Sequence, residues 1–201
     1  MSFSTDMLAE LGIVASRGAE HASSALSTFI GRSVHVDVGT VNMVAIEQVP
    51  ERLGAGEVLT VALVTRVAGE ITGNAALLFQ RPEALQLVRW LGSPATDVPA
   101  AGFGELERSM LEETANITIS SFMNSITAHL AKRCVPNAPM YLMDLAGAIL
   151  SVVVMESAAV ADTALLFSTR FLCDADQMQA LFVFLPSPEA LQALREGLED
   201  G

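Results

Sequence analysis

Positively charged side chains are scarce in this chain, which carries 11 Lys and Arg against 23 Asp and Glu, for a net charge of −12. An acidic surface repels phosphate backbones and anionic lipid headgroups, so the charge argues against nucleic acid and membrane partners. A basic leader is also missing, because the first residues, MSFSTDMLAEL, include Asp6 and Glu10. We therefore expect a cytoplasmic protein without a signal peptide.

The chain also has few cysteines and histidines, which argues against a metal site. Cys134 and Cys173 form no CxxC pair and have no spacing to histidine that suits zinc, so two reduced thiols are expected. The histidines, His21, His35 and His129, are scattered and are interpreted as structural or surface residues. The glycines form no GxGxxG or Walker sequence, so nucleotide binding has no support.

Long apolar runs are missing as well. The most apolar stretch, Ala146–Met155, is too short to cross a bilayer and is rich in β-branched side chains, so we interpret it as a buried strand. Apolar residues nevertheless make up 51% of the chain, which is typical of a protein with a substantial core. Its 201 residues fit one domain or two small fused halves.

An internal duplication favours the two fused halves. The string Pro-Glu-Ala-Leu-Gln occurs at Pro82–Gln86 and again 106 residues later at Pro188–Gln192. Each copy follows an apolar run and begins a short helix, since Pro and Glu both suit a first helical turn. A long helical segment precedes each set of strands, at roughly Thr5–Ile30 and roughly Gly104–Lys132. The segment Thr96–Gly104 is the expected joint between the halves.

Each half is predicted to contain one long helix, three strands and one short helix. The predicted strands are Ser33–Ala45, Glu57–Val67, Gly69–Phe79, Ala146–Val154, Asp162–Phe171 and Gln177–Leu185. We therefore predict an α+β fold in a single domain of residues 1–201. Its two pseudo-symmetric halves, about 1–100 and 104–201, would share one sheet with the two long helices packed on it.

A polar stripe runs along the second long helix. At 3.6 residues per turn, Ser109, Glu113, Asn116 and Ser120 fall on one side. The apolar residues fall on another face: Leu111, Ala115, Ile119, Phe122, Ile126 and Leu130. Such a stripe is typical of a solvated helix face. An asparagine inside a helix is less ordinary, because its amide competes for backbone hydrogen bonds.

The segment Ser109–Ile117, SMLEETANI, resembles the signature of the CheC/CheX/FliY phosphatases of chemotaxis. The family pattern is Asp or Ser, three residues, Glu, two residues, Asn, about twenty-two residues and Pro. Here the four positions are Ser109, Glu113, Asn116 and, after 22 intervening residues, Pro139. The duplication resembles the CheC branch, whose members carry two copies of the unit, so the resemblance covers nearly the whole chain.

The resemblance implies a hydrolase of two-component signalling that dephosphorylates the aspartyl phosphate of a CheY-like response-regulator receiver. It assigns Asn116 to hold the attacking water and Glu113 to pair with the receiver's active-site lysine. Ser109 would cap or order the helix start, and Pro139 would shape the return toward the strand. No cofactor is expected on this chain, and Mg²⁺ would belong to the receiver. Phosphoryl transfer depends mainly on positioning and charge, which an amide and a carboxylate on one helix can supply.

The first half can be aligned to this pattern in two ways. One places Asp6, Glu10 and Ile13 at the first three positions. The other places Ile13 at the Glu position, Ser16 at the Asn position and Gly39 at the Pro position. Both break the pair, so we predict one working site, on the second long helix.

Two further expectations follow from the resemblance. The alternative function is a non-catalytic receiver-binding adaptor or a flagellar-switch-like scaffold resembling the FliM middle domain, a branch that shares the fold but lacks the Glu/Asn pair. A CheD-like deamidase is a further candidate partner, although no residues here identify it.

Overall fold

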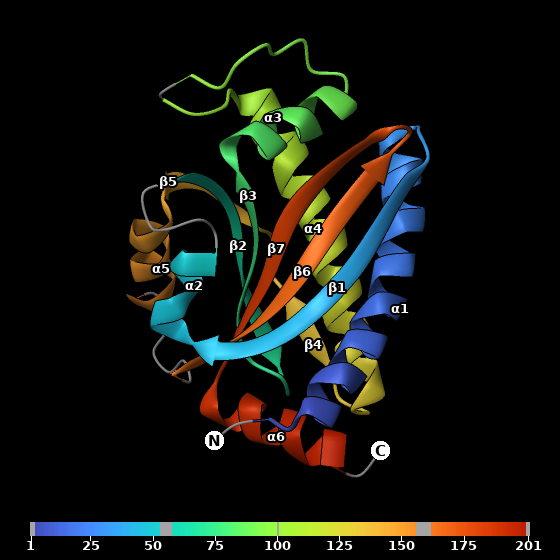
Figure 1. The fold of residues 1–201 in the computed structure, drawn as a ribbon, viewed down its shortest axis with the longest axis vertical. Helices are drawn as coiled ribbons and strands as arrows, with labels where there is room; N and C mark the ends of the chain where they lie inside the picture. Colours follow the sequence, from blue (N-terminus) through green and yellow to red (C-terminus); the bar gives the residue numbers. More distant parts are fainter. Residues whose placement is uncertain (1–2, 53–57, 100, 156–161, 200–201) are drawn as a thin grey trace.

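The computed structural model describes residues 3–52, 58–99, 101–155 and 162–199. Two long helices, α1 (Thr5–Ile30) and α4 (Glu105–His129), lie together on one side of a strongly curled sheet, as Figure 1 shows. The other helices are α2 (Val49–Arg52), α3 (Arg81–Trp90), α5 (Ala146–Met155) and α6 (Pro188–Glu199), with a 3₁₀ turn at Ile46–Gln48. No helix within these residues is long and apolar enough to span a membrane.

The sheet is antiparallel throughout. Its strands are β1 (Val34–Ala45), β2 (Leu59–Gly69), β3 (Gly73–Gln80), β4 (Cys134–Pro136), β5 (Met140–Leu145), β6 (Thr163–Cys173) and β7 (Asp176–Pro186). They lie in the order β1-β6-β7-β3-β2-β4, and β5 pairs with another stretch of β2. The α+β class predicted from the sequence is therefore confirmed.

The order of elements repeats along the chain. The first half runs α1, β1, α2, β2, β3 and α3, and the second runs α4, β4 with β5, α5, β6, β7 and α6. If each strand of one half is replaced by its counterpart in the other half, the strand order reads the same from the opposite edge of the sheet. A two-fold axis between the halves stays a prediction.

The main core lies between the sheet and the two long helices. The predicted apolar face of α4 is buried there, because Leu111, Ala115, Ile119, Phe122 and Ile126 are all at most 1% exposed. The Phe122 ring meets Phe182 of β7 edge to face, with the ring centroids 5.1 Å apart. This packing fixes the rotation of α4 and turns its polar stripe away from the core.

The predicted strand at Ala146–Val154 is wrong, because Ala146–Met155 is the helix α5. The strand that pairs with β2 is instead the preceding segment, β5. An apolar run of this length fits a buried helix as well as a buried strand, and periodicity does not separate them. Ile149 and Val153, four residues apart, are buried in a second, smaller core on the opposite face of the sheet. Asn74 of β3 donates a hydrogen bond to the Val153 carbonyl at 3.0 Å.

Side chains of the long helices accept hydrogen bonds from backbone amides at both edges of the sheet. At the β1 edge the Val36 amide donates to the Ser23 hydroxyl of α1 at 2.8 Å. At the β5 edge the Tyr141 amide donates to the Glu112 carboxylate of α4 at 3.2 Å. Unpaired strand edges otherwise invite pairing with another chain. These bonds also set the position of each long helix along its strand.

Candidate functional site

Glu113 and Asn116 lie on the outer surface of α4, about one helical turn apart. Glu113 is exposed and Asn116 is half-buried. Within the part of the chain that the structure describes, neither side chain takes part in a hydrogen bond or an ion pair. Residues three apart on a helix are neighbours on its surface. The carboxylate and the amide are therefore presented side by side, with their polar atoms available to a partner.

Of the two roles expected for Ser109, capping the helix is wrong, and ordering the helix start stays a prediction. Helix α4 begins at Glu105, and its N-cap is Gly104, which makes no side-chain capping bond. Ser109 lies in the second turn, where it is exposed. It keeps its place on the polar stripe, one turn before Glu113. The sequence placed the start within one residue but misassigned the cap, because a glycine N-cap leaves no side-chain signal.

Two contacts hold the β4–β5 segment along α4. At one end the Thr127 hydroxyl lies 3.8 Å from the Cys134 thiol, within hydrogen-bonding distance for sulfur. At the other end Glu112 accepts the hydrogen bond from the Tyr141 amide. The helix between these contacts spans about 22 Å. The extended segment between them spans about 23 Å, so the two run side by side with matching lengths.

Pro139 lies in the segment between these two contacts. It lies between β4 and β5, directly before Met140, where β5 begins. Interpolating between the two contacts puts it at about the level of the turn of α4 that carries Asn116. Its predicted role in shaping the return toward the strand stays a prediction.

The first half has a corresponding long helix and strand, α1 and β1, but lacks the Glu/Asn pair. Helix α1 begins 100 residues before α4, and β1 begins 100 residues before β4. This register favours the alignment that places Ile13, Ser16 and Gly39 at the positions of Glu, Asn and Pro. The Ile13 side chain is 60% exposed. The Ser16 hydroxyl is engaged with the Gly12 carbonyl at 2.9 Å. An acid–amide pair is therefore missing from this surface of α1.

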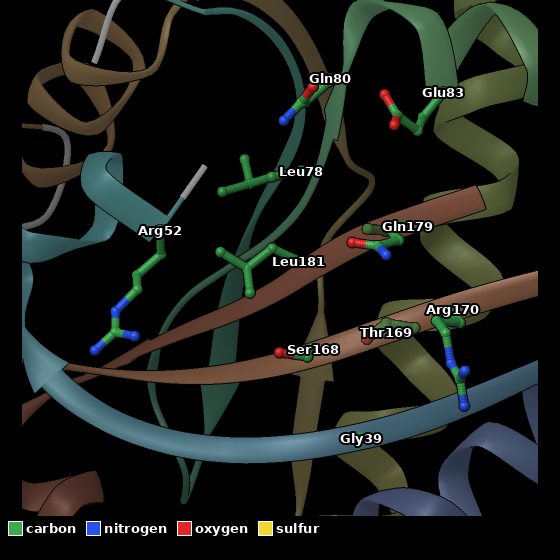
Figure 2. A pocket seen from close by; sticks show the side chains of 11 residues that line it. Gly39, Arg52, Leu78, Gln80, Glu83, Ser168, Thr169, Arg170, Gln179 and Leu181 are labelled. Atoms are coloured by element: carbon green, nitrogen blue, oxygen red, sulfur yellow. The ribbon is translucent and has the colours of Figure 1, made fainter. Parts of the chain in front are cut away.

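A cavity of about 280 Å³ lies elsewhere, on the sheet face turned away from the long helices. Figure 2 shows polar side chains from several elements around it, including Arg52, Gln80, Ser168 and Gln179. Glu113 and Asn116 do not line this cavity. Small-molecule sites are normally concave. A pair presented on the outside of a helix instead suits a large partner that brings its own cleft.

Glu112 and Tyr141 are the residues near the pair that the sequence analysis missed. Glu112 is half-buried and accepts a hydrogen bond from the Tyr141 amide, whereas the neighbouring Glu113 is exposed. The available sequence signal was the spacing of four residues from Glu112 to Asn116, which makes them neighbours on the helix. The partner strand could not be seen, because β5 itself was not predicted.

Comparison with known proteins gives a consistent result. The CheY-P phosphatase CheC of Bacillus subtilis (strain 168) is 24% identical over 192 residues, covering 94% of this chain and 90% of that protein. In sequence the chain is similar to CheC, and in fold it is similar to solved members of the CheC/CheX/FliY family. No protein-family model matches the sequence.

Solved structures of other proteins share this fold. Thermotoga maritima FliY has a TM-score of 0.75 at 15% identity, covering 100% of this chain and 99% of that one. The FliM middle domain from H. pylori has a TM-score of 0.67 at 11% identity, covering 99% of this chain and 100% of that one. At these identities the likeness establishes the shared architecture and leaves the activity to be argued from the site.

Proposed function

We propose that this chain is a phosphatase of a phosphorylated CheY-like receiver, with Glu113 and Asn116 as its catalytic residues. The observation that carries the proposal is the free carboxylate–amide pair on the outside of a well-packed helix, at the family spacing from Pro139. Support comes from the CheC relative, which is a CheY-P phosphatase and aligns over nearly all of this chain.

Asn116 would orient the attacking water. An amide presents one acceptor and two donors in a fixed plane, and it is neither a base nor a nucleophile near neutral pH. In the reaction the water oxygen bonds to phosphorus while the bond from phosphorus to the aspartyl oxygen breaks. Inorganic phosphate and a free receiver aspartate are the products. Mg²⁺, bound by the receiver, would balance the phosphoryl charge.

Glu113 would bind and align the receiver. Its exposed carboxylate is free to pair with a lysine in the receiver's active site, one helical turn from the amide. Such a pair would place the helix in register with the phosphoryl group. Positioning of this kind supplies a large share of the acceleration in phosphoryl transfer.

The test is the loss of phosphate from a phosphorylated CheY-like receiver in excess Mg²⁺. Asn116→Ala and Glu113→Ala are each expected to reduce the acceleration by about 100-fold. Asn124→Ala and Glu105→Ala are the matched controls, because both residues are exposed on the same helix. These controls should retain the wild-type rate. The assignment is wrong if the two site variants speed hydrolysis as much as the wild type does.

A non-catalytic receiver-binding adaptor or flagellar-switch-like scaffold is the second candidate. The FliM likeness favours it, because the same architecture is found in that flagellar protein. Wild-type protein that binds the phosphorylated receiver without hastening its decay would support this candidate. Partnership with a CheD-like deamidase stays a prediction, which a pull-down with that purified protein would test.

A further inference from the structure

The outer edge of β5 is held by Glu112. Strand β5 pairs with β2 on one side, where Tyr141 lies opposite Leu63. The Tyr141 amide points to the other side and donates to the Glu112 carboxylate at 3.2 Å. An outward-pointing amide on an edge strand has no strand partner. Glu112 therefore takes the place of a neighbouring strand and ties the start of β5 to α4.

The Tyr141 side chain is fixed by Phe103, just before α4, and by Arg108 in the first turn of α4. The Arg108 guanidinium lies over its ring, 5.0 Å from the centroid, and the Arg108 Nε donates to the Phe103 carbonyl at 2.7 Å. The Phe103 amide donates to the Tyr141 hydroxyl at 3.4 Å, and the two rings meet edge to face at 6.3 Å. Aromatic and cation–π contacts of this kind restrict the position of the ring. The start of β5 is thus anchored at both its backbone and its side chain.

Glu112 is also the helical neighbour of Asn116, four residues earlier. Side chains at this spacing meet on the helix surface, and a carboxylate there can accept a hydrogen bond from an amide. Because Glu112 is bound to Tyr141, its carboxylate is drawn toward β5 instead. The Asn116 amide is left without a partner in the described residues. The same bond ties to α4 the segment that contains Pro139, two residues before Tyr141.

We infer that Glu112 is a positioning residue for Asn116. By binding the Tyr141 amide it fixes the Pro139 segment against α4 and keeps the Asn116 amide free to hold water. This inference rests on the proposed phosphatase function and adds a role for a carboxylate that touches neither the phosphoryl group nor the water. A displacement of about 1 Å at a reacting position can cost about 100-fold in rate.

The kinetic test compares Glu112→Ala with Glu112→Gln. Glutamine keeps a side-chain carbonyl that can accept from the Tyr141 amide, but it removes the charge. Glu112→Ala is expected to lower kcat for the phosphorylated receiver by about 10- to 100-fold with KM little changed. Glu112→Gln should retain most of the wild-type kcat, as should the Glu105→Ala control.

Three kinetic outcomes would overturn the inference. If Glu112→Gln is as impaired as Glu112→Ala, the charge matters and Glu112 contacts the receiver directly. If Glu112→Ala raises KM and leaves kcat intact, Glu112 belongs to the docking surface. Loss of activity in Asn116→Ala and Glu113→Ala, with full activity in Glu112→Ala, would reject the positioning role alone. Full activity in the first two variants would reject the proposed function itself.

A second measurement does not depend on activity. In NMR spectra, Glu112→Ala should shift the side-chain amide resonances of Asn116 and speed hydrogen exchange at the Tyr141 amide. Glu112→Gln and Glu105→Ala should leave both close to wild type. Unchanged Asn116 resonances in Glu112→Ala would overturn the inference whatever the catalytic result.

Discussion

Gly18 of α1 lies directly against the backbone of Phe122 in α4. A Cβ built on Gly18 would be 2.9 Å from the Phe122 Cα and 2.9 Å from the Ser121 carbonyl oxygen. One turn along α1, the Val14 carbonyl accepts a hydrogen bond from the Ser125 hydroxyl at 2.7 Å. A contact with backbone cannot be relieved by rotating a side chain. Gly18 therefore sets the distance between the long helices, and with it the position of the α4 stripe.

Gly18→Ala is expected to lower the free energy of unfolding by about 1–3 kcal/mol, because the helices must move apart. Gly12→Ala, in the same helix, is the control. Its Cβ would lie 3.6 Å from the Val41 Cγ2, which is ordinary contact, so the gain in helix propensity should stabilise the protein by up to about 1 kcal/mol. Urea unfolding measures both, and equal effects of the two substitutions would refute the close-contact explanation.

Ser23→Ala should weaken the β1 edge. It leaves the Val36 amide, in a residue that is 2% exposed, without its side-chain acceptor. An unsatisfied buried amide costs about 1–3 kcal/mol. Ser24→Ala alters the adjacent exposed serine and should change the free energy of unfolding by less than about 0.5 kcal/mol. A loss in Ser23→Ala no larger than in this control would show that water replaces the hydroxyl.

Asn74→Ala should loosen α5 without disturbing the site. The Asn74 side chain is 7% exposed and supplies a donor to the Val153 carbonyl, near the end of α5 where carbonyls lack helical partners. The expected cost is about 1–3 kcal/mol. Hydrogen exchange should quicken in peptides from Ala146–Met155 and stay unchanged in α4. Asn124→Ala should show neither effect, and a uniform rise across the protein would contradict a local anchor.

Ionisation of Tyr141 should couple to stability at alkaline pH. Burial raises the pKa of Tyr141, while the bond from the Phe103 amide and the nearby Arg108 charge oppose the rise. The folded protein therefore holds this proton more tightly than the unfolded chain does. This contribution to stability is complete below the ordinary tyrosine pKa of about 10 and is lost as pH rises through the folded pKa.

The absorbance of tyrosinate at alkaline pH reports this group directly, because Tyr141 is the only tyrosine in the chain. The folded protein should titrate at higher pH than the urea-unfolded protein. In Tyr141→Phe the fall in stability across this interval should be smaller. Coincident titrations of the folded and unfolded protein would contradict the packing described for the ring.

Much of the architecture was determined by local pattern. Helix α1 was predicted at its observed bounds and α4 nearly so, because a long 3.6-residue period of apolar residues leaves few alternatives. The repeated PEALQ string marked α3 and α6, since Pro and Glu favour the first helical turn. The same period placed Glu113 and Asn116 on one stripe facing away from the core.

Only the tertiary structure decided the rest. The sequence could not show that Ala146–Met155 is a helix, because its apolar residues pack in the second core, on the sheet face turned away from the long helices. It could not show that Glu112 holds the Tyr141 amide, because this bond follows from the pairing of β5 with β2. Local spacing determines which residues share a helix face. The contact between that face and a distant strand depends on packing across the whole chain.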